Sequence, residues 1–328
     1  MMKKDKYPIP RIDDTLDALG GSKLFSTLDA FSGFYQIGMA EDSKEKAAFS
    51  DRYGHYEWNI MPFGLANAPA TFQRHMDVVL SGLTWEHCLV YIDDIIVFSK
   101  DFNSHLISMK LVFKRLSANN MKLKPSKCRF LRKRIKYLGH IVSGDGLEPD
   151  DEKIAPLLKV KRPKSLAELK SILGLVRYFG RFVKDLATVA EPLNALTHGK
   201  QADVNFHWND NLQKCYDEML EILRNPPVLG FPDFAKPFEL HTDASKVGIG
   251  AALTQQNDNG SESVISYYSR ALSTTERRYS TYKREALAVI RALKKFRMYL
   301  IERPFTIYTD HEALLVMKHT KEPTEQIV

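Results

Sequence analysis

Cysteine is scarce in this chain of 328 residues, and its three thiols lie far apart. Cys88, Cys128 and Cys215 form no C-x-x-C pair, so the sequence predicts neither a disulfide framework nor a structural zinc site. No apolar stretch is long enough to cross a bilayer, and the lysine-rich start MMKKDKYPIP lacks the apolar region of a signal peptide. We therefore expect an intracellular protein that is not secreted and has no membrane partner.

Acidic residues are missing from one long segment, residues 110–136, which carries eleven Lys and Arg side chains and no Asp or Glu. The chain as a whole is basic, with net charge +7 and a pI near 9.1. A solvated surface on an ordinary helix and hairpin can also be one-signed, but contact with nucleic-acid phosphates is the better interpretation. With 44% apolar residues, the chain is long enough for two or three folded domains.

Two adjacent aspartates interrupt the apolar run LVYIDDIIVF at residues 89–98. The β-branched residues on both sides predict a β-hairpin with Asp93 and Asp94 at or beside its tip. Two carboxylates about 4 Å apart repel by about 1 kcal/mol in water and about 4 kcal/mol at an effective dielectric near 20. An Asp-Asp pair is often ordinary turn chemistry, but this one must face water or hold a cation. Asp29, which ends another largely apolar segment, is either a turn or cap residue or a third ligand for divalent cations.

The last third of the chain contains a second set of acidic residues at the ends of expected elements. Asp243 follows the alternating segment 238–242, and Asp310 follows the strand expected at 305–308. Glu285 lies early in a helix that Ser280 would cap, and the expected buried face of that helix is Leu287, Ile290, Leu293 and Phe296. Taken one at a time, the three are explained as a turn residue, a favourable charge near a helix N-terminus and an N-cap.

A capping box, Ser165 followed by Glu168, predicts a helix over about 165–187. One face of this helix would carry Lys170, Arg177, Arg181 and Lys184. The opposite face would be apolar, with Ile172, Val176, Phe179, Val183 and Leu186. The basic face is expected to meet phosphates, although many helices carry such residues outward only for solubility.

Taken together, the ordered motifs resemble the reverse transcriptase and RNase H region of gypsy-type LTR retrotransposon Pol polyproteins. The matching segments are FSTLDAFSGFYQI (25–37), MPFGLANAPATFQ (61–73), YIDDIIVFSK (91–100), YLGHIVS (137–143), LGLVRYFGRF (173–182), FELHTDASKVGIGAAL (238–253), YSTYKREALAVIRAL (279–293) and FTIYTDHEAL (305–314). Several motifs in register are far more specific than any one of them.

The resemblance implies a catalytic centre in which two Mg²⁺ ions, or Mn²⁺ as an alternative, are bound by Asp29, Asp93 and Asp94. It implies a nucleotide pocket formed by Ala30, Phe34, Phe63 and Gly64. Phe34 would lie against the sugar, unless it is a core residue. Lys127, or one of its basic neighbours, would protonate the pyrophosphate.

The resemblance also implies residues that contact the primer and the duplex, namely Tyr137, Leu138, Gly139, His140, Lys170, Arg177 and Arg181. In the last third, a second centre with two metal ions would cut the RNA strand of an RNA–DNA hybrid. Its catalytic and metal-binding residues would be Asp243, Glu285 and Asp310.

We therefore expect an α+β protein with three parts. These are a reverse transcriptase palm with partial fingers at residues 1–143, a mostly helical thumb or connection at 144–228, and an incomplete RNase H-like α/β domain at 229–328. Relatives carry basic fingers residues before the first aspartate and a fourth nuclease carboxylate, for which this chain offers only Glu312, Glu322 and Glu325. The sequence thus predicts a fragment truncated at both ends.

Three functions remain open at this point. The first is an RNA-directed DNA polymerase with an attached RNase H region, whose partners are an RNA template, a DNA primer, RNA–DNA hybrid and dNTPs. The second is an impaired remnant that binds RNA–DNA or DNA duplex without turnover, and the third is a packaging protein. The first two would act in the cytoplasm, inside a virus-like particle, or in the nucleus.

Overall fold

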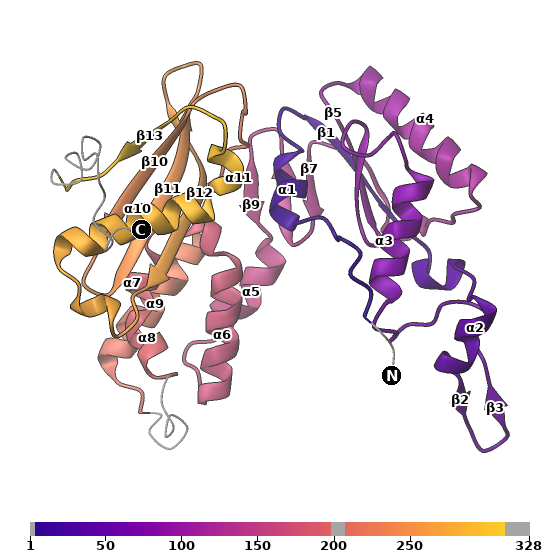
Figure 1. Ribbon diagram of the computed structural model, residues 1–328, viewed down its shortest axis with the longest axis horizontal. Helices are drawn as coiled ribbons and strands as arrows, with labels where there is room; N and C mark the ends of the chain where they lie inside the picture. Colours follow the sequence, from indigo (N-terminus) through magenta and orange to yellow (C-terminus); the bar gives the residue numbers. More distant parts are fainter. Residues whose placement is uncertain (1–3, 198–206, 312–328) are drawn as a thin grey trace, which may run out of the picture. The chain divides into compact units, whose positions relative to one another are not determined.

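A computed structural model describes residues 4–197 and 207–311 of the chain. The chain divides into two compact units, residues 1–144 and 145–328, which are described separately (Figure 1). Each unit combines helices with β-sheet, so the predicted α+β class is confirmed. The expected boundary at residue 228, inside the second unit, stays a prediction.

The first unit is built around a mixed set of short helices and strands. Its helices are α1 (Ile12–Asp17), α2 (Glu41–Lys44), α3 (Ala68–Val79) and α4 (Phe102–Ala118), with 3₁₀ turns at Gly33–Gln36, Glu45–Ala47 and Pro125–Lys127. Its strands are β1 (Leu24–Asp29), β2 (Phe49–Ser50), β3 (His55–Tyr56), β4 (Cys88–Tyr91), β5 (Asp94–Ser99), β6 (Arg129–Arg132), β7 (Arg134–Tyr137) and β8 (His140–Ser143). Strands β4, β5, β1 and β6 form a sheet in that order, while β2–β3 and β7–β8 are antiparallel hairpins.

The core of the first unit lies where helices α3 and α4 pack on the four-stranded sheet. Phe72 of α3 and Val112 of α4 are fully buried in one apolar cluster with Val97 of β5. Strand β5 is buried along residues 95–99, as expected of a strand covered on both faces. This packing fixes the two strands whose ends carry the aspartates.

The second unit combines a helical segment with a larger sheet. Its helices are α5 (Asp151–Lys159), α6 (Leu166–Tyr178), α7 (Leu186–Val189), α8 (Glu191–Ala195), α9 (Asp210–Arg224), α10 (Thr281–Lys295) and α11 (Arg297–Leu300), with 3₁₀ turns at Gly180–Phe182 and Glu276–Arg278. Its strands are β9 (Leu147–Pro149), β10 (Phe238–Ala244), β11 (Gly248–Gln256), β12 (Glu262–Ala271) and β13 (Phe305–Tyr308). The sheet order is β12, β11, β10, β13, with β13 parallel to β10 and the other pairs antiparallel.

Helix α6 begins where the capping box predicts but ends earlier than expected. The Ser165 side chain accepts a hydrogen bond from the Glu168 backbone N–H at 3.2 Å. The helix stops at Tyr178, before the 3₁₀ turn at Gly180–Phe182, so the prediction of one helix to residue 187 is wrong. The helical conformation is interrupted at Gly180 and again at Asp185, whose φ of 52° is left-handed. The five residues expected on the apolar face are nevertheless all buried.

Helix α10 is capped by Ser280 as predicted, but its fully buried face differs from the predicted one. The buried positions are Glu285, Ala288, Ala292 and Phe296, whereas Leu287, Ile290 and Leu293 are only half-buried. Leu293 and Leu287 still pack against the buried apolar clusters, but only as partly buried residues. Within the residues described, no helix is both long and apolar enough to span a membrane.

Candidate active sites

Three aspartates of the first unit lie at one end of its sheet. Strands β4 and β5 form the predicted hairpin, in which Tyr91 pairs with Asp94 and the turn consists of Ile92 and Asp93. Strand β1 runs antiparallel to β5 in a register that sets Asp29 directly opposite Asp94. The pairing of these two strands therefore brings together residues that are 65 positions apart in the sequence.

A buried glutamine of α3, Gln73, supports the turn of this hairpin. Its Oε1 accepts a hydrogen bond from the Ile92 backbone N–H at 2.7 Å, and its Nε2 donates to the Val90 carbonyl at 3.3 Å and to Asp77 at 2.9 Å. Ile92 has a left-handed φ of 54°, which is costly for a β-branched residue. Sequence analysis missed the role of Gln73, although its place at the end of the MPFGLANAPATFQ motif was a signal.

Charge repulsion is built into this group of carboxylates. Loss of hydration between the strands, then the charges of Asp93 and Asp29, raise the pKa of Asp94 to about 6, and Lys127 partly offsets this. Lys127 Nζ lies 3.0 Å from Asp29 Oδ2, and this hydrogen bond raises the pKa of the lysine. An aspartate whose ionised form is disfavoured by two neighbouring carboxylates has the charge environment of a divalent-cation ligand.

Two of the four residues expected to bind the nucleotide, Ala30 and Phe34, follow Asp29 in the chain, and Phe63 contacts Phe34 in the fold. The Phe34 ring packs 5.1 Å from Phe63 and 5.5 Å from Phe72 of the core, so Phe34 is half-buried. Phe63 is 58% exposed, and Gly64 after it has a φ of 91° that favours glycine. Ala30 is buried at the end of β1. Phe34 thus lies between an exposed ring and the core.

The residues expected to contact the primer form the tip of the β7–β8 hairpin. Leu138 and Gly139 have φ values of 47° and 74°, as a two-residue type I′ turn requires. The flanking Tyr137 and His140 are each 3% exposed, so only the turn itself reaches the surface. Burial, followed by the charge of Asp94, raises the pKa of Tyr137 well above its ordinary value.

The basic residues predicted to share one face of a long helix are separated by the break after α6. Lys170 and Arg177 are exposed on α6, and Arg177 donates a hydrogen bond to Asn194 Oδ1 at 2.7 Å. Arg181 is half-buried in the following 3₁₀ turn, and Lys184 lies beyond it. Of the expected basic stripe, only Lys170 and Arg177 lie on α6 itself.

In the second unit, the structure brings Asp243, Glu285 and Asp310 together. Their carboxylate oxygens lie within 4.8 Å of one another, although they come from the end of β10, from α10 and from the segment after β13. Glu285 is 3% exposed, and its Oε2 has no hydrogen-bond partner within the part of the chain described. Burial, then the charges of Asp310 and Asp243, raise its pKa to about 7. Such a set of oxygen ligands suits a hard divalent cation.

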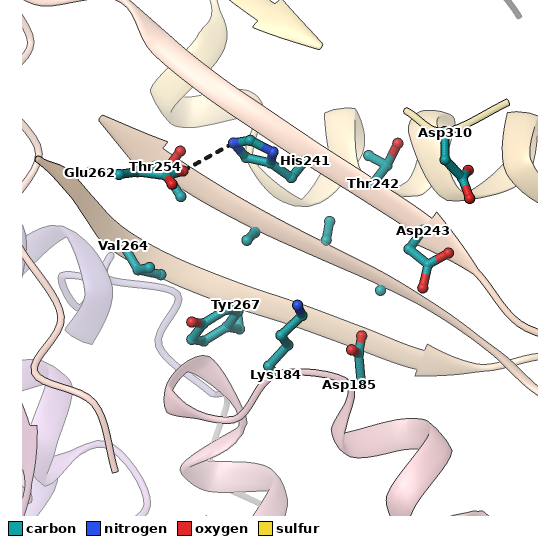
Figure 2. A pocket seen from close by; sticks show the side chains of 13 residues that line it. Lys184, Asp185, His241, Thr242, Asp243, Thr254, Glu262, Val264, Tyr267 and Asp310 are labelled. Carbon is teal, nitrogen blue, oxygen red and sulfur yellow. Dashed lines mark ion pairs between the residues drawn. The ribbon is translucent and has the colours of Figure 1, made fainter. Parts of the chain in front are cut away.

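A cavity of about 440 Å³ opens beside two of these carboxylates, Asp243 and Asp310 (Figure 2). Lys184 and Asp185 reach toward it from the segment before α7, facing the strands of the sheet (Figure 2). Burial and then Asp243 raise the pKa of Asp185, and Lys184 lowers it. Sequence analysis did not single out Asp185, because it fell inside the helix expected over about 165–187.

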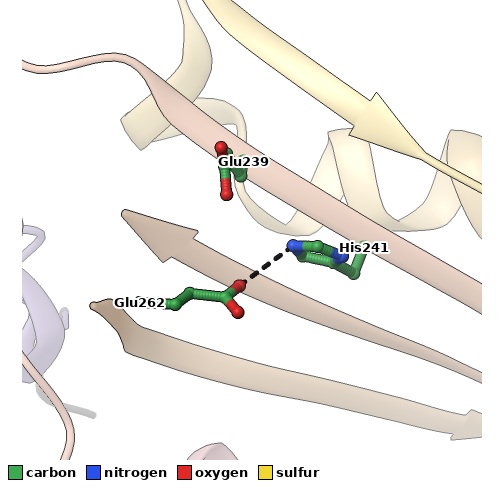
Figure 3. Close-up of side chains that lie close together, drawn as sticks. All are labelled: Glu239, His241 and Glu262. Carbon is green, nitrogen blue, oxygen red and sulfur yellow. Dashed lines mark ion pairs between the residues drawn. The ribbon is translucent and has the colours of Figure 1, made fainter. Parts of the chain in front are cut away.

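A further group of possible ligand atoms lies on the same face of the sheet, formed by Glu239, His241 and Glu262 (Figure 3). His241 Nε2 lies 3.0 Å from Glu262 Oε1, and its ring stacks on Tyr308 with centroids 4.7 Å apart. Sequence analysis missed this group, although alternation along β10 puts Glu239 and His241 on one face. A cross-strand ion pair explains its geometry.

The sequence offers three glutamates for the fourth carboxylate that related nucleases carry. Glu312, Glu322 and Glu325 all lie outside the described residues. The helix that Asp310 was expected to cap would also lie outside the described residues.

Two protein families match the two parts of the chain. Residues 1–142 match the family described as "Reverse transcriptase (RNA-dependent DNA polymerase)". Residues 208–307 match the family described as "RNase H-like domain found in reverse transcriptase".

Curated relatives align with nearly the whole chain. The Pol polyprotein from transposon 297 of Drosophila melanogaster is 42% identical over 97% of this chain. That from transposon gypsy of the same species is 39% identical over 94%, and the Tf2-3 polyprotein of Schizosaccharomyces pombe is 34% identical over 96%. The chain spans only 30%, 30% and 24% of the lengths of these three relatives.

Solved structures of foamy viral protease-reverse transcriptase have a similar fold. One is the foamy viral protease-reverse transcriptase dRH in complex with double-stranded DNA. It matches this chain with a TM-score of 0.86 at 23% identity, covering 99% of this chain and 57% of that one. The complex with RNA/DNA hybrid gives a TM-score of 0.81 at 22% identity, covering 99% and 44%. At this level of identity the likeness establishes the fold.

Proposed function

The chain belongs to the reverse transcriptase and RNase H region of gypsy-type retrotransposon Pol polyproteins, and we propose that residues 1–144 catalyse RNA-templated DNA synthesis. The observation that carries this proposal is the strand register that sets Asp29 opposite Asp94, beside Asp93 in the hairpin turn. Three carboxylates at the joined ends of two strands have little structural use, because they repel one another.

Asp29, Asp93 and Asp94 would hold two Mg²⁺ ions, for which Mn²⁺ can substitute. When bound, such ions activate the primer 3′-hydroxyl and neutralise the triphosphate of the incoming dNTP. The half-buried Phe34 ring, held between Phe63 and the core, would form a wall beside the sugar. Lys127, whose Nζ lies 3.0 Å from Asp29 Oδ2, would protonate the leaving pyrophosphate.

For the second unit, the proposed reaction is hydrolysis of the RNA strand in an RNA–DNA hybrid. Asp243, Glu285 and Asp310 would hold the divalent cations there, and the unpaired Oε2 of buried Glu285 supports this fit. The foamy viral proteins of similar fold were solved with DNA duplex and with RNA/DNA hybrid. The same classes of partner, with dNTPs, are proposed for this chain, in the cytoplasm within a virus-like particle or in the nucleus.

A primer-extension assay tests the polymerase proposal. The wild-type chain, with an RNA template, a DNA primer, dNTPs and Mg²⁺, is expected to extend the primer, and Asp93→Asn is expected to abolish extension. Asp42→Asn, which changes an exposed aspartate of α2, is the matched control and should leave extension unchanged. Duplex binding measured in parallel separates catalysis from binding. Extension that survives Asp93→Asn would refute the proposal, and salt-sensitive binding without extension by the wild type would favour a binding-only remnant.

A further inference from the structure

A completely buried histidine of α4, His105, lies between the two strands that carry the first set of aspartates. Its ring nitrogens each contact a serine hydroxyl: Nε2 lies 2.8 Å from Ser26 Oγ of β1, and Nδ1 lies 2.8 Å from Ser99 Oγ of β5. Both serines are themselves buried. One side chain therefore links the helix to two neighbouring strands inside the core.

The partners of the two serines determine which ring nitrogen carries the proton. Ser99 donates its own hydroxyl proton to the Asp101 carbonyl at 3.1 Å, so its oxygen accepts from His105 Nδ1–H. Nε2 of the neutral ring then accepts from the Ser26 hydroxyl, whose oxygen in turn accepts from the Leu131 backbone N–H at 3.0 Å. Every donor in this chain has an acceptor, and the chain runs in one direction.

No charged side chain contacts the ring within the described part of the chain. Ser26 faces it from β1 and Ser99 from β5, while the Asp101 backbone carbonyl accepts from the Ser99 hydroxyl. The Asp101 carboxylate is used elsewhere, because it accepts hydrogen bonds from the backbone N–H and the hydroxyl of Ser104. Burial lowers the pKa of His105, which favours the neutral ring that the hydrogen bonds require.

We propose that His105 is a positioning residue for DNA synthesis, which holds β1 and β5 in the register that sets Asp29 opposite Asp94. Ser26 lies three residues before Asp29 on β1, and Ser99 lies five residues after Asp94 on β5. A slip by one residue would move one serine by about 3.4 Å, beyond hydrogen-bond reach, and turn it to the other face of the sheet. Buried hydroxyls would then lack partners. The inference rests on the proposed polymerase function, because it assigns a task within that centre.

Three substitutions distinguish the two hydrogen bonds of His105 from the contribution that its ring makes by packing alone. In His105→Asn, the side-chain amide N–H occupies the place of Nδ1–H, so the link to Ser99 is kept and the link to Ser26 is lost. In His105→Gln, the longer side chain reaches the place of Nε2, so its oxygen can accept from Ser26 while the link to Ser99 is lost. His105→Phe keeps a ring of similar size and removes both links.

The matched control is His87, which also contacts α4 through a serine. Its Nδ1 lies 2.9 Å from Ser108 Oγ, but its hydrogen bond links no residue of β1 to β5. His87→Phe therefore removes a histidine–serine pair of the same kind and leaves the links of His105 to Ser26 and Ser99 intact. These two links together are called the register lock.

Primer extension is measured at saturating template, with kcat normalised to folded protein by urea unfolding of each variant. For His105→Phe we expect kcat to fall at least about tenfold with an unchanged KM for dNTP, because misplacing reacting groups by about 1 Å can cost about 100-fold. His105→Asn and His105→Gln should each recover part of kcat, and His87→Phe should resemble the wild type. A His105→Phe variant with wild-type kcat, or one that alters KM alone, would overturn the proposal.

Two readouts independent of activity keep this test separate from the proposed function. Long-range ¹H–¹⁵N spectra of histidine-labelled protein, assigned by the signal lost in His105→Phe, should show a neutral Nδ1–H ring at pH 7. Amide hydrogen exchange along β1 and β5 should be faster in His105→Phe than in His87→Phe. If the wild type fails to extend primers, the proposed function is refuted while these readouts still decide on the lock. A charged ring, the opposite tautomer or unchanged exchange would refute the lock itself.

Discussion

At the scale of single residues, Asp94 carries a proton more readily than an ordinary aspartate. Its pKa of about 6 in the absence of cations means that the metal-binding form is complete only above that pH. Protons and Mg²⁺ compete for the same oxygens, so we expect primer extension to decline below about pH 6 at low Mg²⁺. Raising the Mg²⁺ concentration should move the decline to lower pH. Rate–pH profiles at two Mg²⁺ concentrations check this, and a midpoint that Mg²⁺ does not move would contradict it.

Glu285 allows a sharper prediction, because it is almost completely buried. Its pKa of about 7 lies above the ordinary value of 4.5, so the folded chain holds a proton that the unfolded chain releases in this range. The free energy of unfolding therefore falls as pH rises from about 4.5 to about 7. The difference, at about 1.4 kcal/mol per pH unit, amounts to at most about 3 kcal/mol.

Glu285→Gln removes this ionisation, so at pH 8 in EDTA the variant should be more stable than the wild type by up to about 3 kcal/mol. At pH 4.5 the advantage should be lost, and excess Mg²⁺ at pH 8 should stabilise the wild type more than the variant, because only the wild type keeps the Glu285 carboxylate as a ligand. The same variant should lose hydrolysis of RNA in a hybrid. Urea unfolding at the two pH values measures the difference in the free energy of unfolding between variant and wild type. A difference that is no more favourable to the variant at pH 8 than at pH 4.5 would contradict the prediction.

At the scale of elements, the β4–β5 hairpin depends on helix α3 for the shape of its turn. Gln73→Leu keeps the apolar packing of the helix but leaves the Ile92 N–H without its acceptor. We expect the free energy of unfolding to fall by about 1–3 kcal/mol, the cost of an unsatisfied buried group. Primer extension should fall by more than the loss of folded protein explains, because Ile92 would leave its left-handed conformation and move Asp93. Urea unfolding and extension by one preparation test this, and full extension by a destabilised Gln73→Leu would argue against it.

The elements also show why sequence patterns predicted some features and missed others. The hairpin around Asp93 and Asp94 and the helix caps at Ser165 and Ser280 were predictable, because each depends on neighbouring residues. The early end of α6 was not, because the apolar spacing continues through the 3₁₀ turn, and Phe179 and Val183 on its two sides are buried as predicted. Contacts across the fold, such as Gln73 with the turn and His105 with two strands, leave no periodic pattern in the sequence.

At the scale of the whole molecule, each group of carboxylates is built within one compact unit. Asp29, Asp93 and Asp94 belong to residues 1–144, whereas Asp243, Glu285 and Asp310 belong to residues 145–328. The two proposed reactions should therefore be separable by substitution.

Asp93→Asn is expected to abolish extension and to leave cleavage of RNA in a hybrid within about twofold of wild type, whereas Asp243→Asn should do the reverse, since each group of carboxylates belongs to its own unit. Each variant thus serves as the control for the other, because both exchange one solvent-exposed carboxylate for an amide. Both activities are measured on the same preparations with a labelled RNA template annealed to a DNA primer. A large loss of extension in Asp243→Asn would mean that the two groups of carboxylates act together on one duplex, which would contradict their assignment as independent centres.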